Sequence, residues 1–430
     1  MSIPTYTLNK QGSITLGGMK AVILCGGPQK GTRFRPLSLD VPKPLFPIAG
    51  LPMVEHQIEA CSKIPNLKEI LLIGFFQPSE KLTRFVHEMR DKYKLNIRYL
   101  QEYTMLGTAG SIYHFRDIIL NGRPEAFFVI FSDVFCDYPL KEMLEARQKW
   151  MKYMLMSVEV DHEQTRNYGV VGIDEKSQEV VHYIEKPASF VSQYINAGVY
   201  LLDSDVFEDI SKVFNSRYEN EEADFDRVGY ISLEDDIFSN IAGQGKMFAY
   251  KHDQFWLSIK SAGSALYANR VQLELYKKNS PERLQKSFQQ GQDNTVFVHP
   301  SAQVDPSAKL GPHVAIGPNV KIGPGVRVKN SIVLDNVTLK ENCCILNSII
   351  GWHSIVGEWS RVEGTATKLD PNSPHATTDN FRLFDEHGKL RESVTILGRD
   401  VIVPDEVIIL NSIVLPSKDM SWGLKNEILL

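Results

Sequence analysis

The chain has 430 residues, of which 43% are apolar and 23% charged, and its formal net charge is −5. This length predicts two domains, or three, and the composition is typical of a soluble globular protein. The small negative charge gives no reason to expect nucleic acid or an anionic membrane as a partner, and no stretch reaches the roughly 18 apolar residues of a membrane span.

Residues 1–18 are polar and lack the apolar run of a signal peptide, so we expect an extension before the first domain. The five cysteines are odd in number and show no zinc-site spacing. A reducing compartment fits these features, and we predict a cytoplasmic protein.

The first predicted strand, residues 21–24, runs into a glycine-rich turn that is followed by cations. A loop with few side chains lets backbone N–H groups approach phosphates, and nearby cations neutralise their charge. We therefore favour a phosphate site over an ordinary glycine turn. Its residues are Gly26, Gly27, Gly31, Thr32, Arg33, Arg35 and Lys43.

The spacing of this segment excludes a Walker loop and the G-x-G-x-x-G turn of dinucleotide binders. The segment resembles the signature loop of the sugar-phosphate nucleotidyltransferases, roughly G-G-x-G-T-R-L-x-P-L-T and then P-K-P. That family has one residue between Gly-Gly and Gly-Thr-Arg, whereas this chain has Pro28, Gln29 and Lys30.

Apolar runs and amphipathic stretches alternate from about residue 20 to 260. The runs at 69–74 and 126–131 predict buried strands, and the stretches at 53–63 and 79–94 predict helices, the second with Ser79 as its N-cap. This alternation predicts a Rossmann-like α/β domain, residues 19–261, with a mostly parallel sheet. Ligands bind beyond the carboxyl ends of such strands.

Asp133 follows an apolar strand and is therefore expected at the carboxyl end of the sheet, near the phosphate loop. A carboxylate there can hold Mg²⁺, which prefers oxygen ligands and bridges phosphates. The alternative is an aspartate that caps the next turn.

Further candidates gather in four short segments. Gly107, Thr108 and Gly110 form a second small-residue loop, which predicts contact with a nucleotide base, although such a loop also starts helices. Three later segments offer groups for a sugar phosphate, although each alone would suggest only a turn. These groups are Gly169, Glu185, Lys186 and Asn196.

Apolar residues recur at every sixth position in the last third of the chain. They are Val298, Val304, Leu310, Ile316, Ile322, Val328 and Leu334, then Ile350, Val356 and Val362, then Ile396, Ile402, Ile408 and Val414. A sustained period of six predicts a left-handed parallel β-helix over residues 296–430. The alternative, a sandwich that meets this spacing by coincidence, is disfavoured.

Two segments lie outside the predicted α/β domain and the repeats of the predicted β-helix. Residues 262–295 are a predicted linker that begins with a helix over 262–283. Residues 364–392 keep no register and predict a loop inserted into the β-helix. Such a loop is functional or disordered, and the sequence does not decide between the two.

Within the family, the chain is most similar to the GDP-mannose pyrophosphorylases over residues 19–430, including the segments 351–359 and 413–416. The resemblance implies nucleotidyl transfer, in which the phosphate of mannose 1-phosphate attacks the α-phosphorus of GTP and pyrophosphate leaves. It assigns Arg33 and Lys43 to phosphate charge, Asp133 to metal and Lys186 to the sugar phosphate.

One expected residue is missing. Active members have a second metal-binding aspartate in a segment like F-W-x-D-I-G, whereas this chain has Ser258 at that position and Lys260 in place of the glycine. A hydroxyl is a far weaker Mg²⁺ ligand than a carboxylate, so we expect any Mg²⁺ to be weakly held.

The enlarged glycine loop, Ser258 and the 364–392 insertion together resemble the regulatory alpha subunits of eukaryotic GDP-mannose pyrophosphorylases. This resemblance implies a hetero-oligomer in which the chain binds GDP-mannose and inhibits a catalytic beta subunit. It also implies that the insertion reaches toward the partner's active site. The uncovered ends of a β-helix also favour self-association. The alternatives are an active mannose-1-phosphate guanylyltransferase, or a translation-initiation exchange-factor subunit with the same two-domain plan.

Overall fold

The structure is a computed structural model of the chain. It describes residues 18–27, 32–39, 41–219, 229–285, 295–366, 384 and 390–430. Within these residues the chain forms two compact units. The first contains residues up to 26 and 57–254, and the second contains 27–56 and 255–430. The predicted domain boundaries, at 19–261 and 296–430, run along the sequence instead and remain predictions.

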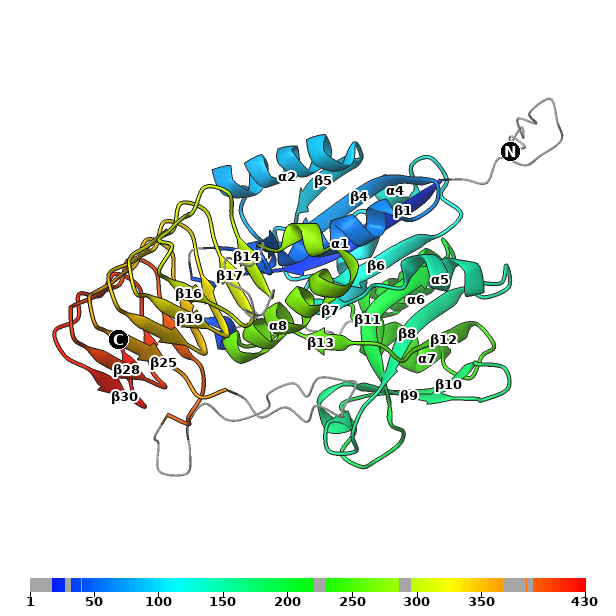
Figure 1. The fold of residues 1–430 in the computed structure, drawn as a ribbon. Coiled ribbons are helices and arrows are strands. Elements are labelled where there is room, and N and C mark those ends of the chain that lie inside the picture. Colours follow the sequence, from blue (N-terminus) through cyan, green and yellow to red (C-terminus); the bar gives the residue numbers. More distant parts are fainter. Residues whose placement is uncertain are drawn as a thin grey trace. The chain divides into compact units, whose positions relative to one another are not determined.

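The first unit is built around one sheet (Figure 1). The strands of this unit are β1 Met19–Gly26, β4 Leu67–Gly74, β5 Asn96–Gln101, β6 Phe127–Phe131, β7 Val134–Cys136, β8 Tyr153–Glu159, β9 Gly169–Ile173, β10 Val180–Glu185, β11 Tyr194–Leu202 and β12 Met247–His252, and all of them except β7 belong to this sheet. Its helical segments are α2 Glu80–Tyr93, α3 Gly107–His114, α4 Arg116–Leu120, α5 Leu140–Ala146, η3 Thr165–Asn167, α6 Val206–Tyr218, η5 Leu233–Phe238 and α7 Ser239–Ile241. Helix α1, Met53–Ser62, begins in the second unit and ends in the first.

The strand order of the main sheet is β10-β9-β11-β6-β1-β4-β5. Strand β8 pairs with β11, and β12 pairs with β8. Strands β6, β1, β4 and β5 run parallel, as the alternating pattern predicted. The predicted helices at 53–63 and 79–94 are confirmed as α1 and α2, and the Ser79 hydroxyl accepts a hydrogen bond from the Leu82 N–H at 3.3 Å.

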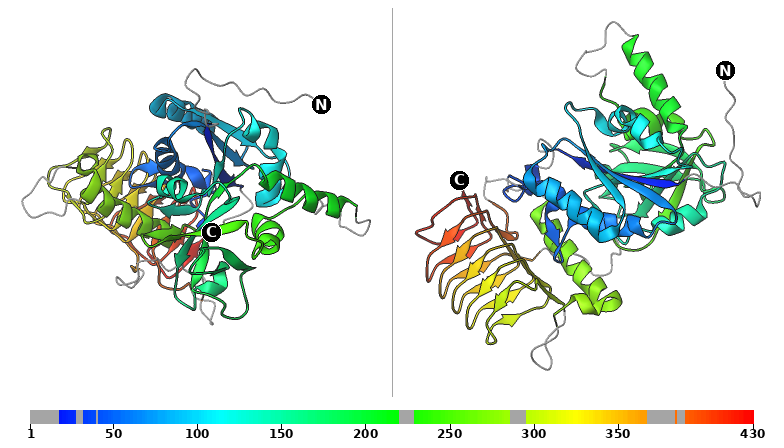
Figure 2. Two further views of the ribbon diagram at one scale, coloured as in Figure 1. Left: turned by 90° about the vertical axis from the view of Figure 1, so that its right-hand side faces the viewer. Right: turned by 90° about the horizontal axis from the view of Figure 1, so that it is seen from above.

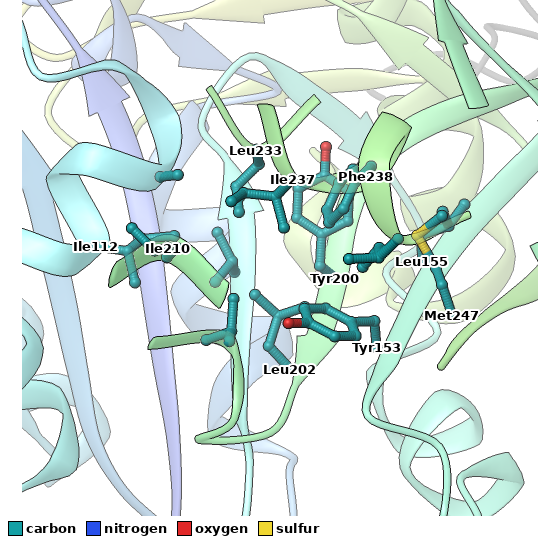
Figure 3. Packing of buried hydrophobic residues seen from close by; sticks show 14 of the residues in the cluster. Ile112, Tyr153, Leu155, Tyr200, Leu202, Ile210, Leu233, Ile237, Phe238 and Met247 are labelled. Atoms are coloured by element: carbon teal, nitrogen blue, oxygen red, sulfur yellow. The ribbon is translucent and has the colours of Figure 1, made fainter. Parts of the chain in front are cut away.

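Helices and sheet meet in one hydrophobic cluster (Figure 3). Residues of α3, α6 and η5, such as Ile112, Ile210 and Phe238, pack over strand residues of β8 and β11. Figure 3 shows the ring of Tyr200 beside Phe238, and the two ring centroids are 5.0 Å apart. This packing fixes η5 against the sheet.

The second unit begins with short segments and continues into repeated strands. Its helical segments are η1 Thr32–Phe34, η2 Lys43–Leu45, α8 Ala262–Asn279 and η6 Pro281–Arg283. The strands before the repeats are β2 Pro47–Ile48, β3 Leu51–Pro52 and β13 Trp256–Ser258. The predicted helix at 262–283 ends at Asn279, because Ser280 is extended and Pro281 cannot continue the hydrogen-bond pattern of the helix.

The repeated strands form three sheets of parallel strands (Figure 2), and up to β29 each sheet takes every third strand. The first sheet contains β14 Val296–Val298, β17 Val314–Ile316, β20 Ser331–Val333, β23 Ser348–Ile350, β26 Thr395–Leu397, β29 Ile413–Val414 and β31 Ile428–Leu429. The second contains β15 Gln303–Val304, β18 Lys321–Ile322, β21 Thr338–Leu339, β24 Ile355–Val356 and β27 Ile402–Val403. The third contains β16 Lys309–Leu310, β19 Arg327–Lys329, β22 Cys344–Leu346, β25 Arg361–Glu363, β28 Ile408–Leu410 and β30 Leu424–Lys425. The predicted parallel β-helix is confirmed.

The period of six is not constant. Val298 pairs with Ile316, eighteen residues on, whereas Ile316 pairs with Val333, seventeen residues on. The missing residue is at the corner from the third sheet to the first, where Asn330 and Asn347 take left-handed backbone conformations with φ of 45° and 47°. Asparagine tolerates that conformation, so one residue can turn the corner.

The shortened corner makes several predicted interior residues wrong. Four residues of the predicted pattern are outside the interior cluster, and a direct neighbour of each belongs to it. The four are Leu334, Ile396, Ile402 and Ile408, and the neighbours in the cluster are Val333, Leu397, Val403 and Ile409. Ile402 and Ile408 are exposed, at 44% and 54% of their surface.

The insertion leaves the β-helix at this same corner. The Gly364 N–H donates to the Leu346 carbonyl at 2.9 Å, and the Thr365 N–H donates to the Ser393 carbonyl at 3.0 Å. The Thr365 N–H also lies 2.7 Å from Oδ1 of Asn411 in the next coil. Both ends of the insertion are thus held at one point, while residues 367–383 and 385–389 lie outside the described residues.

A buried ion pair joins three neighbouring strands of the first unit. Nζ of Lys20 on β1 lies 2.9 Å from Oε2 of Glu69 on β4, and Nε of Arg98 on β5 lies 2.7 Å from Oε1 of the same carboxylate. The side chains of Lys20 and Glu69 are each only 7% exposed. Lys20 also donates to the Ile118 carbonyl at 2.7 Å.

We expect Glu69→Ala to lower the free energy of unfolding by about 3–5 kcal/mol, because it leaves a buried ammonium without its counter-charge. Urea unfolding measures this loss. Glu88→Ala is the matched control, since Glu88 forms an exposed pair with Arg84 at 3.6 Å and should cost at most about 0.5 kcal/mol. Equal effects of the two substitutions would contradict the prediction.

Candidate functional site

The predicted phosphate segment passes from the first unit to the second. Gly26 ends β1 with φ of 67°, and its carbonyl accepts a hydrogen bond from the Phe75 N–H at 2.8 Å. Gly27 follows in the second unit. Gly31 and the three extra residues 28–30 lie outside the described residues, so the enlarged turn remains a prediction.

The cations that follow the turn belong to the second unit. Thr32 and Arg33 are exposed in η1, together with Arg35 after it, and the buried Phe34 packs edge-on against Phe46 at 5.0 Å. Nζ of Lys43 lies 5.8 Å from the centre of the Phe34 ring. Their predicted roles toward phosphates remain predictions.

The second small-residue loop forms the start of α3 and packs against residues 229–231. The N–H groups of Ala109 and Gly110 donate to the Ile231 carbonyl at 2.9 and 3.0 Å. A Cβ atom on Gly107, whose φ is 75°, would lie 2.4 Å from that carbonyl oxygen. Close backbone packing thus requires these glycines, and contact with a nucleotide base remains a prediction.

Thr108 in this loop contacts Glu234, a residue that was not predicted from the sequence. Its hydroxyl donates to Oε2 of Glu234 at 2.7 Å and accepts from the Leu233 N–H at 2.8 Å. The hydroxyl of Ser232 donates to the same carboxylate oxygen at 2.7 Å. Burial raises the pKa of the Glu234 carboxyl, while the hydrogen bonds from Ser232 and Thr108 oppose that rise.

The only sequence signal for Glu234 is the cap of η5. The hydroxyl of Ser232 accepts hydrogen bonds from the N–H groups of Glu234 and Asp235, both at 3.2 Å. A serine, one apolar residue and then three acidic residues predict the start of a helical turn. It does not predict that one of these carboxylates turns inward toward Thr108, because that depends on tertiary packing.

The four predicted sugar-phosphate residues come together on three strands of the first unit. Gly169 on β9 lies opposite Glu185 on β10, and Ile195 on β11, next to Asn196, pairs with Val170 on β9. Nζ of Lys186 lies 3.0 Å from Oε1 of Glu185.

Two buried tyrosines connect these residues to Glu234. The Asn196 amide donates to the hydroxyls of Tyr183 and Tyr200 at 3.0 and 2.8 Å. The Tyr183 hydroxyl donates to Oε2 of Glu185 at 3.3 Å, and the Tyr200 hydroxyl donates to Oε1 of Glu234 at 3.4 Å. Burial raises the pKa of both phenols well above their ordinary value. We call this group the tyrosine–carboxylate cluster; its members are Thr108, Tyr183, Glu185, Lys186, Asn196, Tyr200, Ser232 and Glu234.

The candidate metal ligands belong to different units. Asp133 is half-buried in the turn after β6, in the first unit. Ser258 is 4% exposed at the end of β13, in the second. Among the described residues, no group of three or more histidines, cysteines, aspartates or glutamates is arranged to hold a metal ion. The hydroxyl of Ser258 does not fit a Mg²⁺ site that needs two carboxylates.

One cavity of about 430 Å³ lies elsewhere in the first unit, beside Asp137, Tyr250 and His252. Nε2 of His252 lies 2.9 Å from Oδ1 of Asp137. None of the predicted site residues lines it. No helix among the described residues combines the length and apolar character needed to cross a membrane.

Comparison with known families divides the chain into two matched parts. Residues 20–250 match the family model described as nucleotidyl transferase, and residues 292–429 match the one described as the GMPPB C-terminal domain. The chain is 52% identical over 422 residues to the mannose-1-phosphate guanylyltransferase regulatory subunit alpha-A of Danio rerio, covering 96% of this chain and all of that one. It is 50% identical over 420 residues to the regulatory subunit alpha of Homo sapiens, with the same coverage.

A solved structure shares the fold of the nucleotidyltransferase part. It is that of a proposed glucose-1-phosphate thymidylyltransferase from Bacillus anthracis in complex with sucrose, with a TM-score of 0.50 and 21% identity. The match covers 59% of this chain and 95% of that one. At this identity the likeness supports the fold alone.

Gly169→Ala should disturb the cluster, because the new Cβ atom would lie 2.1 Å from the Tyr183 hydroxyl oxygen and 2.7 Å from Oε2 of Glu185. We expect a loss of about 1–3 kcal/mol in the free energy of unfolding, measured in urea. Gly229→Ala is the control, since its Cβ atom would meet only Leu106 at 3.6 Å. An unchanged stability of the Gly169 variant would contradict this prediction.

Proposed function

The chain belongs to the family of mannose-1-phosphate guanylyltransferase regulatory subunits alpha, and from this membership we propose that it binds GDP-mannose and restrains a catalytic beta subunit. In this proposal the chain itself makes little or no GDP-mannose. The product of the partner's reaction is then the signal that the chain senses.

Ser258 carries the non-catalytic part of the proposal. Family resemblance expects a carboxylate at this position, and the chain has a buried hydroxyl there. Phosphoryl and nucleotidyl transfer depend on neutralising the charge of the reacting phosphates, and a metal supplies most of that charge. A chain with one carboxylate fewer should bind a nucleotide sugar better than it turns one over.

The presence of the residues predicted to contact the sugar phosphate supports the proposal that the chain binds GDP-mannose. Gly169, Glu185, Lys186 and Asn196 lie on neighbouring strands and are tied together by hydrogen bonds and an ion pair. Lys186 is exposed on the strand end and can meet a phosphate, while Glu185 orients its ammonium group. Guanine and mannose are inferred from the family, and self-association of the chain remains a further proposal.

An active mannose-1-phosphate guanylyltransferase is the second candidate. Asp133 and Lys43 are both present and support it, because Asp133 could hold a metal ion and Lys43 could neutralise phosphate charge. The two candidates differ in turnover and share the binding of GDP-mannose, so they can be separated by measuring both.

We expect the purified chain, given GTP, mannose 1-phosphate and Mg²⁺, to turn over well below about 1 s⁻¹, at the low end for enzymes. Calorimetric titration should still show saturable binding of GDP-mannose. Lys186→Ala should weaken that binding about tenfold, because it removes a charge-assisted contact to phosphate. Lys176→Ala, which changes an exposed lysine of the 174–178 turn, should leave it unchanged. Turnover at or above about 1 s⁻¹ would favour the active enzyme.

The insertion is the proposed inhibitory element. Replacing residues 367–389 by Asn-Gly should leave GDP-mannose binding intact and abolish GDP-mannose-dependent inhibition of a catalytic beta subunit in a reconstituted assay. The hydrogen bond from Thr365 to Ser393 already closes the base of the insertion. The variant should therefore unfold in urea within about 1 kcal/mol of the parent, since closure entropy changes slowly with loop length. Inhibition that survives the replacement would refute this role.

A further inference from the structure

One continuous chain of hydrogen bonds and one ion pair crosses the tyrosine–carboxylate cluster. It connects the loop predicted to meet the nucleotide with the strands predicted to meet the sugar phosphate. In order, its members are Thr108, Glu234, Tyr200, Asn196, Tyr183, Glu185 and Lys186. All of them lie in the first unit.

The direction of these hydrogen bonds is set by Asn196. An amide group has two hydrogens, and here one goes to each tyrosine hydroxyl. Each hydroxyl has one hydrogen of its own, which it gives to a carboxylate: Tyr200 to Glu234 and Tyr183 to Glu185. Because Oδ1 of Asn196 accepts the Gly198 N–H at 3.0 Å, the whole side chain is oriented by its neighbours.

Glu234 joins Thr108 to Tyr200, and through Tyr200 to Asn196. Its Oε2 accepts from Thr108 and Ser232, both at 2.7 Å, and its Oε1 accepts from Tyr200 at 3.4 Å. Glu234 is half-buried, and a carboxylate partly withdrawn from water is costly unless such donors surround it. The same three donors lose their strongest acceptor if the carboxylate is removed, since hydrogen bonds to charged groups are the stronger ones.

We propose that Glu234 is a positioning residue that couples the nucleotide side of the cluster, at Thr108, to its sugar side, at Asn196. It acts through Thr108 and Tyr200 and need not touch the ligand itself. This inference rests on the proposed function, because it requires that GDP-mannose binds at these residues of the first unit. A ligand that engages Thr108 then favours the arrangement of Asn196 that suits the sugar.

The first measurement compares Glu234→Gln with the parent. The amide keeps the shape of the side chain but replaces one acceptor oxygen by a donor, so either Tyr200 or the Thr108–Ser232 pair loses its acceptor. Affinity for GDP-mannose, measured by calorimetry, should fall about tenfold, as expected for a hydrogen bond to a charged group. Affinity for GDP alone should fall less, whereas mere unfolding would lower both alike. Glu175→Gln, at an exposed glutamate, is the control and should change neither.

The decisive measurement is a double-mutant cycle between Thr108→Val and Asn196→Ala, with GDP-mannose affinity as the readout. In the parent background we expect the two effects to deviate from additivity by about fivefold or more. In the Glu234→Gln background they should become additive. Tyr200→Phe removes the next link without touching Thr108, and it should abolish the coupling equally.

The outcomes separate this inference from the proposed function. Additivity in the parent background, or coupling that persists in both the Glu234→Gln and the Tyr200→Phe backgrounds, would overturn the role of Glu234 while GDP-mannose binding stands. Absence of GDP-mannose binding by the parent chain would overturn the proposed function, and this inference with it.

Discussion

Hydrogen bonding to the Glu234 carboxylate holds together parts of the first unit that are far apart in sequence. Thr108 belongs to the start of α3, Ser232 to the cap of η5 and Tyr200 to a central strand, and all three donate to this one side chain. Glu234 is half-buried, and these three donors offset the cost of withdrawing its carboxylate from water. The first unit therefore has a polar network whose members share hydrogen-bond partners, in addition to its hydrophobic cluster.

That polar centre also limits what could be predicted from the sequence. Asn196, Glu185 and Lys186 stand out because each follows or precedes an apolar strand, and the strands then bring them together. Glu234 does not stand out, because the acidic run 234–236 is typical of a solvated helix start. The Glu234 carboxylate meets Thr108 because η5 packs against β11, and that information is not local. Tyr183 and Tyr200 were missed for the same reason, since a tyrosine in a strand usually indicates only a core position.

The β-helix shows a different limit. Its architecture follows from periodicity, because an apolar residue every six positions fits few other folds. Its register does not follow, because a corner can lose one residue without disturbing the strands on either side. Asn330 and Asn347 mark that corner only in retrospect, through their left-handed backbone. Across a shortened corner two interior residues are five positions apart, as Ile409 and Val414 are, so Ile408 and Ile402, six and twelve residues before Val414, face outward although they fit the pattern.

The corner that lost a residue is also the corner that accepts the insertion. Residues 330, 347 and 364 occupy equivalent places in successive coils, since Lys329, Leu346 and Glu363 pair with one another in the third sheet. Only the last of these places carries extra chain. The coils before and after the insertion pair directly with each other, so the parallel sheets continue across the place where the extra chain leaves. Evolution can lengthen, exchange or delete it there, and selection on its sequence then comes from what it touches and little from the fold that carries it.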